Sequence, residues 1–182
     1  MEAFRTLRTT LCFAGEDRNR LVVTSAEPGD GKTTVISQLA TSFGMAGKRT
    51  LLIDADLRKP GLSRLFKMRG QPGLSDILRS DDDLDPLCAA RIRPTGIDGV
   101  DLLPCGPKPS DPLELLSGPR FELLLGWAEA HYDQILIDTP PILSTSETSV
   151  LARHVGQVLF VVEAHATGAA QVQEAVSLVS VC

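Results

Sequence analysis

One segment constrains the fold of this chain more than any other, an apolar run that leads into a glycine-rich turn. It covers residues 21–34 and reads LVVTSAEPGDGKTT. Glycines let backbone N–H groups turn toward an anion, and the N-terminus of a following helix attracts negative charge through its dipole. The segment therefore predicts a strand, a phosphate-binding loop and a helix. It departs from the usual pattern at Ala26, where a glycine normally stands.

The residues of this turn have distinct expected roles toward a bound nucleotide. Lys32 can reach the terminal phosphates and stabilise charge during catalysis, and Thr33 can offer its hydroxyl to Mg²⁺. Backbone N–H groups of residues 29–31 should face the phosphates. The other expected nucleotide-binding residues are Pro28, Gly29, Asp30, Gly31 and Thr34.

Two further apolar runs end in aspartates. LLIDADLRKP places Asp54 and Asp56 after one run, and ILIDTPP places Asp138 after another. A single aspartate after a strand most often caps a loop or a helix. Ligands bind outside the carboxyl ends of parallel strands, however, so these carboxylates should converge on phosphates held after a third strand. Because Mg²⁺ prefers oxygen ligands, the set predicts a magnesium and nucleotide site.

Together these segments resemble the bacterial tyrosine kinases, P-loop kinases that regulate capsular and exopolysaccharide assembly. The resemblance is carried by SAEPGDGKTT, LLIDADLRKP and ILIDTPP, and it extends over nearly the whole chain. The segments GLSDIL and LLPCGPKPSDPLELL look like the connecting segments of that family. The resemblance implies ATP-dependent transfer of the γ-phosphate to protein tyrosines, with ATP and Mg²⁺ as cofactors.

The resemblance also suggests roles for individual side chains. The second aspartate motif should contribute the catalytic base, with Asp54 favoured over Asp56. The expected metal ligands are Thr33, Asp56 and Asp138. Arg58 could either contact phosphate or pair with an aspartate, since arginine serves both uses well, and the sequence leaves both possibilities open.

The N-terminal segment EAFRTLRTTL is similar to the family's Glu-x-x-Arg-x-x-Arg self-association helix, through Glu2, Arg5 and Arg8. Residues at this spacing form one drifting stripe on a helix. A solvated charged face is the simpler interpretation of such a stripe. Apolar companions and the family motif favour a subunit contact, so we expect a helix over residues 1–15 and a homo-oligomer, either a ring or a dimer. The companions are Phe4, Leu7 and Leu11.

Apolar runs alternate with amphipathic stretches along the chain, as is typical of a parallel sheet covered by helices. The expected strands are residues 21–24, 50–54, 100–103, 134–138 and 157–162. The best-defined helix follows the phosphate loop and ends at Gly47, and a second long helix should cover residues 119–131. Shorter helices should begin near Leu62, Leu74 and Pro112. We predict an α/β fold with a mostly parallel central sheet, a three-layer P-loop NTPase in a single domain over residues 1–182.

Composition agrees with one domain and disfavours some functions. A chain of 182 residues can bury one sizeable core. The formal net charge of −5 argues against nucleic acid as a partner.

Four cysteines without metal-ligand or Cys-x-x-Cys spacing indicate reduced thiols in a cytoplasmic compartment. No stretch approaches the roughly 18 to 20 apolar residues of a membrane span. The cysteines are Cys12, Cys88, Cys105 and Cys182.

The resemblance implies partners outside the chain. These are protein tyrosine substrates and a membrane activator of the polysaccharide co-polymerase type, which would place the chain at the inner face of the cell membrane. Tyr132 is the only tyrosine, and its place directly before an expected strand makes it a poor phosphate acceptor. A helix over residues 171–182 would ordinarily lead to another strand, so we expect a truncated C-terminal end that lacks the family's tyrosine-rich tail.

Two other functions stay open at the level of the sequence. ATPases of the partitioning and division-site class share the sheet and the metal aspartates, but they resemble one another in a lysine where this chain has Glu27. A nucleotide-binding module that regulates a polysaccharide export complex with little kinase activity is the other alternative, and the single tyrosine supports it. Glu27 and the N-terminal arginine helix favour the kinase.

Overall fold

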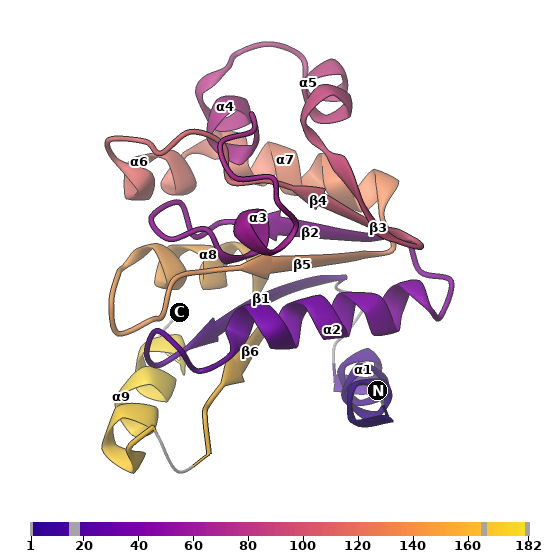
Figure 1. Cartoon of the computed structure of the whole chain (residues 1–182). Helices are drawn as coiled ribbons and strands as arrows, with labels where there is room; N and C mark the ends of the chain where they lie inside the picture. The colour runs from indigo at the N-terminus through magenta and orange to yellow at the C-terminus, as the bar shows by residue number, and fades with distance from the viewer. Residues whose placement is uncertain (1, 15–18, 165–166, 181–182) are drawn as a thin grey trace.

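The computed structural model describes residues 2–14, 19–164 and 167–180, and within them six strands form one open sheet (Figure 1). The strands are β1 (Arg20–Ser25), β2 (Thr50–Asp54), β3 (Arg93–Ile97), β4 (Val100–Leu103), β5 (Gln134–Asp138) and β6 (Val158–Val161). Their order across the sheet is β3-β4-β2-β5-β1-β6. All neighbouring pairs are parallel except β3 with β4. The predicted mostly parallel sheet is confirmed, and the five expected strands agree with the observed ones to within a residue at each end.

The antiparallel edge strand β3 is not predicted by the sequence pattern. Its sequence, RPTGI, contains Pro94 and Gly96, two residue types that are disfavoured within strands. The structure accommodates them because β3 pairs only with β4, and because the register of that pair shifts between Pro94 and Ile97. An edge strand can lose ladder hydrogen bonds in this way without disrupting the sheet.

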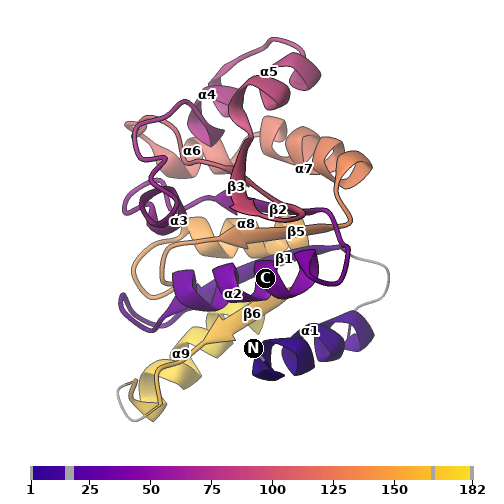
Figure 2. The ribbon, with the colours of Figure 1, turned by 45° about the vertical axis from the view of Figure 1, so that its right-hand side comes forward.

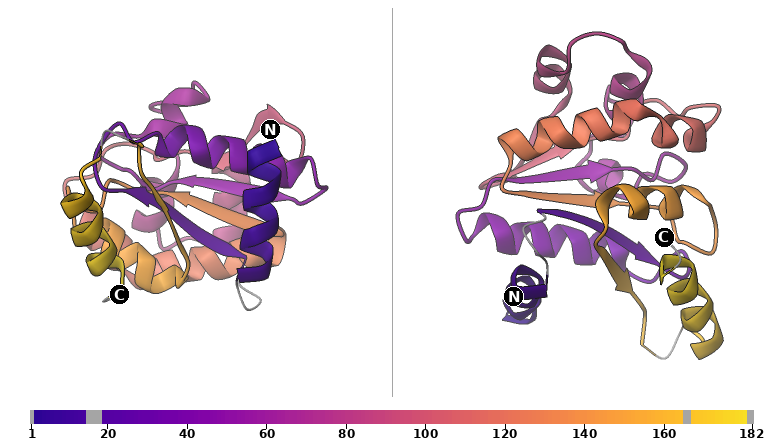
Figure 3. Two further views of the ribbon diagram at one scale, coloured as in Figure 1. Left: turned by 90° about the horizontal axis from the view of Figure 1, so that it is seen from below. Right: turned by 180° about the vertical axis from the view of Figure 1, so that it is seen from behind.

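Helices cover both faces of the sheet. They are α1 (Glu2–Ala14), α2 (Lys32–Gly44), α3 (Gly61–Leu65), α4 (Leu74–Arg79), α5 (Leu84–Arg91), α6 (Pro112–Ser117), α7 (Pro119–His131), α8 (Glu147–Val155) and α9 (Ala169–Ser180). The helices α1 to α3 lie on one face, and α4 to α8 lie on the other (Figures 1 and 3). The three-layer α/β/α fold is therefore confirmed. The helices α5 and α8 are additions to the predicted set.

Residues along each strand alternate between two hydrophobic cores. In β1, Leu21 and Val23 pack toward α2, whereas Val22 packs toward α7 and α8. The helix α2 presents Ile36 and Leu39 to its side of the sheet, both fully buried. Because the central strands are covered on both faces, they read as continuous apolar runs rather than as alternating ones.

The N-terminal helix α1 lies beside α2 of the same chain (Figure 2). Its apolar residues pack against the core that α2 shares with the sheet, and its Arg8 Nη1 donates a hydrogen bond to the carbonyl oxygen of Ser42. The apolar stripe expected to support a subunit contact is thus used within the chain. It comprises Phe4, Leu7 and Leu11.

Within the described residues, no helix is both long and apolar enough to span a membrane. Cys12, Cys88 and Cys105 are free thiols, as expected. Cys182, and with it the end of the helix expected over residues 171–182, lies outside the described residues, as do Met1 and residue 15 of the expected N-terminal helix.

Phe121→Ala tests the core on the α7 side of the sheet. Phe121 is fully buried, so its truncation should lower the free energy of unfolding by about 3–5 kcal/mol. Leu123→Ala on the same helix is the matched control, because Leu123 is 57% exposed and its loss should cost under about 0.5 kcal/mol. Urea denaturation followed by circular dichroism measures both changes. Equal losses in the two variants would contradict this packing.

Candidate nucleotide and metal site

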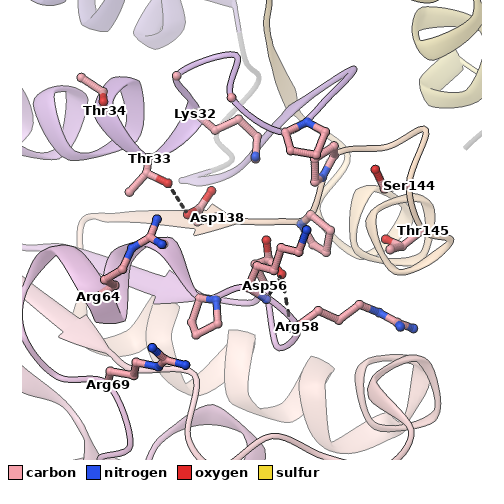
Figure 4. A pocket seen from close by; sticks show the side chains of 18 residues that line it. Lys32, Thr33, Thr34, Asp56, Arg58, Arg64, Arg69, Asp138, Ser144 and Thr145 are labelled. Atoms are coloured by element: carbon pink, nitrogen blue, oxygen red, sulfur yellow. Dashed lines mark hydrogen bonds between the residues drawn. The ribbon is translucent and has the colours of Figure 1, made fainter.

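The strands β1, β2 and β5 end at the same edge of the sheet, and a cavity of about 610 Å³ opens there (Figure 4). Asp54 and Asp138 are register partners at the ends of β2 and β5. The phosphate loop lines one wall of the cavity, residues between Asp56 and Arg69 line the opposite wall, and residues between Asp138 and Thr145 line a third side. The predicted convergence of these segments is therefore observed.

The turn between β1 and α2 has the backbone conformation that its glycines predict. Gly29 and Gly31 have φ angles of 106° and 87°, in the left-handed region that favours glycine. Asp30 does not line the cavity. Its carboxylate instead accepts hydrogen bonds from the Glu27 N–H at 3.1 Å and from Thr167 Oγ1 at 3.0 Å. The other predicted loop residues line the cavity, and these are Pro28, Gly29, Gly31, Lys32, Thr33 and Thr34.

Lys32 stands at the first position of α2, with its side chain directed into the cavity (Figure 4). Its ammonium group makes no hydrogen bond or ion pair with any of the residues that the structure describes. An unpaired cation at a helix N-terminus is well suited to bind the terminal phosphates of a nucleotide.

Asp138 and Thr33 fit the requirements of a magnesium ion. Asp138 is 2% exposed, and its Oδ2 accepts a hydrogen bond from Thr33 Oγ1 at 3.4 Å. Its Oδ1 is buried and has no hydrogen-bond partner among the described residues. Burial and the neighbouring carboxylate of Asp54 raise the pKa of Asp138 well above its ordinary value. A divalent cation at Oδ1 would satisfy this atom and favour the ionised carboxylate.

The predicted metal carboxylates, Asp56 and Asp138, line the same cavity, but among the described residues they are not joined there by a third acidic, histidine or cysteine ligand. Across the described ranges, no three His, Cys, Asp or Glu side chains are close enough together to hold a metal ion. The protein would therefore contribute few direct ligands. That number suits Mg²⁺, which keeps several waters and takes one or two carboxylates together with the phosphates of its substrate.

Asp56 presents one free oxygen to the cavity. Its Oδ1 accepts hydrogen bonds from the N–H groups of Arg58 at 3.3 Å and Lys59 at 2.8 Å. Its Oδ2 accepts none from the part of the chain that the structure describes, and the residue lines the cavity. The two N–H groups hold this carboxylate in one orientation, with the second oxygen available to a proton or a cation.

Asp54 lies behind the cavity rather than in its lining. It is fully buried, and its Oδ2 accepts hydrogen bonds from Ser63 N at 2.6 Å and from Ser63 Oγ at 2.7 Å. Ser63 Oγ in turn accepts a hydrogen bond from the Cys105 N–H at 3.0 Å. Burial raises the pKa of Asp54 to about 6. Asp54 thus ties the start of α3 and the segment after β4 to the end of β2.

Arg58 pairs with a residue that the sequence does not suggest. Its Nε and Nη2 atoms each lie 2.8 Å from Oε1 of Glu147, in the first turn of α8. Glu147 is 2% exposed, so the pair joins the segment after β2 to the start of α8 through a buried carboxylate. The partner within the chain is therefore a glutamate rather than an aspartate. Lys59, Arg64 and Arg69 also line the cavity without having been predicted, and their only sequence signal is their position shortly after the second aspartate motif.

Tyr132 lies outside the cavity, beyond the amino end of β5. Its hydroxyl donates a hydrogen bond to Asp101 Oδ2 at 3.0 Å. Burial and the charge of Asp101 raise the pKa of this hydroxyl. The side chain is therefore held in a structural contact and is a poor nucleophile, as its place in the sequence predicts.

The chain is similar to known tyrosine kinases in sequence and in structure. It is 42% identical to the tyrosine-protein kinase wzc of Salmonella typhimurium, over 88% of this chain and 22% of that relative. The solved kinase domain of the Escherichia coli tyrosine kinase ETK matches it with a TM-score of 0.91 and 37% identity, over 100% of this chain and 70% of that one. The chain spans about a fifth of the length of the curated relatives it matches.

A more distant likeness connects the chain to a division-site protein. The septum site-determining protein MinD of Pyrococcus horikoshii, solved in complex with Mg-ADP, matches with a TM-score of 0.64 and 25% identity. That match covers 79% of this chain and 57% of the other. No protein-family model matches the chain. The P-loop ATPases of this class are thus related in fold, at a lower similarity than the kinase domains.

Proposed function

This chain belongs to the bacterial tyrosine-protein kinases, and on this premise we propose that it transfers the γ-phosphate of ATP to tyrosine side chains of other proteins. One observation carries the proposal. The cavity combines a phosphate loop and the unpaired Lys32 with an oriented carboxylate, Asp56, whose free oxygen faces the same space. Phosphoryl transfer requires this combination, because its catalysis consists mostly of positioning and charge stabilisation.

Each side chain at the cavity receives a role in this proposal. Lys32 stabilises the negative charge on the transferred phosphoryl group, and Asp56 accepts the proton of the tyrosine hydroxyl. Thr33 and Asp138 would hold Mg²⁺, and a bound Mg²⁺ would supply charge neutralisation at the phosphate oxygens. Asp54 supports the site from behind, because it accepts the Ser63 hydrogen bonds and does not line the cavity. The base is therefore reassigned from Asp54, which the sequence favours, to Asp56.

A matched assay of ATP hydrolysis and tyrosine-peptide phosphorylation tests the proposal. The same preparation is incubated with MgATP, and ADP and phosphopeptide are quantified in parallel. Phosphopeptide formed in proportion to ADP supports the kinase. ADP without phosphopeptide would favour an ATPase of the partitioning class, and tight nucleotide binding with neither product would favour a regulatory module.

We also propose that the chain acts at the cytoplasmic face of a membrane, with a polysaccharide co-polymerase as its activator. The support is the family resemblance of its motifs and connecting segments. The formal net charge of −5 agrees with a protein partner rather than with nucleic acid.

Self-association through α1 is a further part of the proposal, and the structure narrows the residues available for it. Glu2 and Arg5 are exposed, whereas Arg8 donates to the Ser42 carbonyl of α2 in the same chain. Glu2 and Arg5 would then form the contact with a neighbouring subunit, because arginine can hold a carboxylate with two parallel hydrogen bonds. Arg8 would position α1 for it.

Arg5→Ala is expected to lower the mass of the oligomer in light scattering and to leave the circular dichroism spectrum unchanged. The reason is that Arg5 is exposed and its side chain makes no hydrogen bond or ion pair with the residues that the structure describes. Thr9→Ala is the control, since Thr9 is exposed on the same helix and its hydroxyl donates to the Arg5 carbonyl of that helix. All samples are compared at one concentration, because association follows mass action. An unchanged mass in the Arg5 variant would contradict the subunit contact and favour a solvated charged face.

A further inference from the structure

We infer that the cavity selects tyrosines that lie in acidic segments of a protein substrate, and that Arg64 and Arg69 make the selection. This inference rests on the kinase activity proposed above and specifies the substrate class of the same cavity. It starts from the distribution of charge around the cavity. Five basic side chains and two acidic ones line it, although the chain as a whole has a formal net charge of −5.

Arg64 and Arg69 are the two arginines of this lining that have no hydrogen-bond or ion-pair partner within the described residues. Arg64 belongs to α3, and Arg69 lies in the turn that follows it. Both are exposed, and neither side chain makes a hydrogen bond or ion pair with any residue in the described ranges. Arg58 differs from them, because Glu147 already neutralises it. Two arginines at a cavity mouth are thus free to bind an anion.

The two arginines lie across the cavity from the phosphate loop, so an anion bound by them would not be a phosphate of the nucleotide. The phosphate loop, the N-terminus of α2 and Lys32 all lie on one wall, and they already supply the charge that a nucleotide needs. Figure 4 shows Arg64 and Arg69 on the other side of Asp138 from Lys32, with Arg64 directed toward the cavity. An acceptor must approach roughly in line, opposite the leaving oxygen. Arg64 and Arg69 therefore line the approach of the acceptor.

Carboxylates on the acceptor segment match these groups best. A guanidinium presents a rigid fork of donors that binds a carboxylate with two parallel hydrogen bonds. Acidic residues beside the tyrosine would gain these contacts, and lysine or arginine in their place would be repelled. Tyr132 of the same chain would not compete with a substrate tyrosine for the cavity, because its hydroxyl donates to Asp101 outside the cavity.

The test compares three peptides that carry one tyrosine each and differ only in flanking residues, which are glutamate, alanine or lysine. Binding is measured by fluorescence polarisation with Mg²⁺ and a non-hydrolysable ATP analogue, and transfer from ATP is measured in parallel. The glutamate peptide should bind about tenfold more tightly than the alanine peptide and the lysine peptide more weakly still. The preference should weaken as salt is added, because exposed charges are screened.

A charge-reversal variant makes the test specific. Arg64→Glu combined with Arg69→Glu should invert the order of the three peptides, and the affinity for the ATP analogue should change by less than about twofold. Arg79→Glu is the matched control, since Arg79 is exposed on α4 and does not line the cavity. It should retain the wild-type order.

Three results would overturn the inference. These are equal affinities for all peptides, an unchanged order in the charge-reversal variant, and an inverted order in the Arg79 variant. Selective binding of the glutamate peptide without any transfer would instead support the inference and contradict the proposed kinase activity. The binding measurement thus tests the selection of acidic segments, and the transfer measurement separately tests the proposed kinase activity.

Discussion

Lys32→Met should lower the rate of phosphoryl transfer to tyrosine by about 10³-fold, the largest loss expected from any single substitution in this chain. The charge on the transferred phosphoryl group is spread over its oxygens in the transition state, and a fixed cation nearby is worth most at that point. Lys32 is the cation at the start of α2, and it projects into the cavity. Methionine keeps the length of the side chain but removes the charge.

The fold of the Lys32 variant should be unchanged, because the ammonium group contributes no hydrogen bond or ion pair within the described residues. Circular dichroism and the urea midpoint measure this directly. Lys48→Met is the matched control, since Lys48 is exposed between α2 and β2 and lies outside the cavity lining. It should keep full activity. A folded Lys32 variant with normal transfer would refute the role of the phosphate loop.

The parts of the fold that the sequence predicts well are those whose pattern is local. The glycines of the phosphate loop predict the left-handed backbone conformation that the loop adopts. The central strands are continuous apolar runs because helices cover both of their faces. The edge strand β3 lacks such a pattern. Its Pro94 and Gly96 are tolerated because β3 lies at the edge of the described sheet and pairs with β4 alone. That position depends on the tertiary structure and cannot be read from the local sequence.

The chemistry of the site is less predictable for a related reason. The aspartate motif gives the spacing of Asp54 and Asp56, but it does not say which carboxylate will be buried. That outcome depends on Ser63, which donates to Asp54 from α3, and on Cys105, which donates to Ser63 from the segment after β4. The ion pair of Arg58 depends in the same way on Glu147, 89 residues further along the chain.

The N-terminal helix illustrates a further limit. A stripe of arginines with apolar companions has the same appearance whether it binds another subunit or its own domain. In the structure, the apolar residues and Arg8 contact α2 of the same chain, which leaves Glu2 and Arg5 exposed. Periodicity identifies the helix and its apolar face, but only the fold identifies what that face contacts.

Asp138→Asn and Asp56→Asn should both reduce transfer by about 10²-fold or more, through different steps. Asp138 has a buried oxygen without a partner beside Thr33, and its loss should remove the gain in nucleotide affinity that Mg²⁺ provides. Asp56 is held by two backbone N–H groups with its other oxygen free, so its loss should lower kcat and leave nucleotide binding nearly intact. Titrations of a fluorescent ATP analogue with and without Mg²⁺, paired with initial rates, measure the difference.

Asp54→Asn decides between the two candidates for the base. Asparagine can still accept the Ser63 hydrogen bonds through its amide oxygen, so the supporting role of Asp54 should survive the substitution. The transfer rate should then fall much less than in the Asp56 variant. If Asp54 were the proton acceptor, the Asp54→Asn substitution would abolish that role, because an amide oxygen is a far weaker base than a carboxylate. An Asp54 variant as inactive as the Asp56 variant, with nucleotide binding intact, would return the proton-accepting role to Asp54.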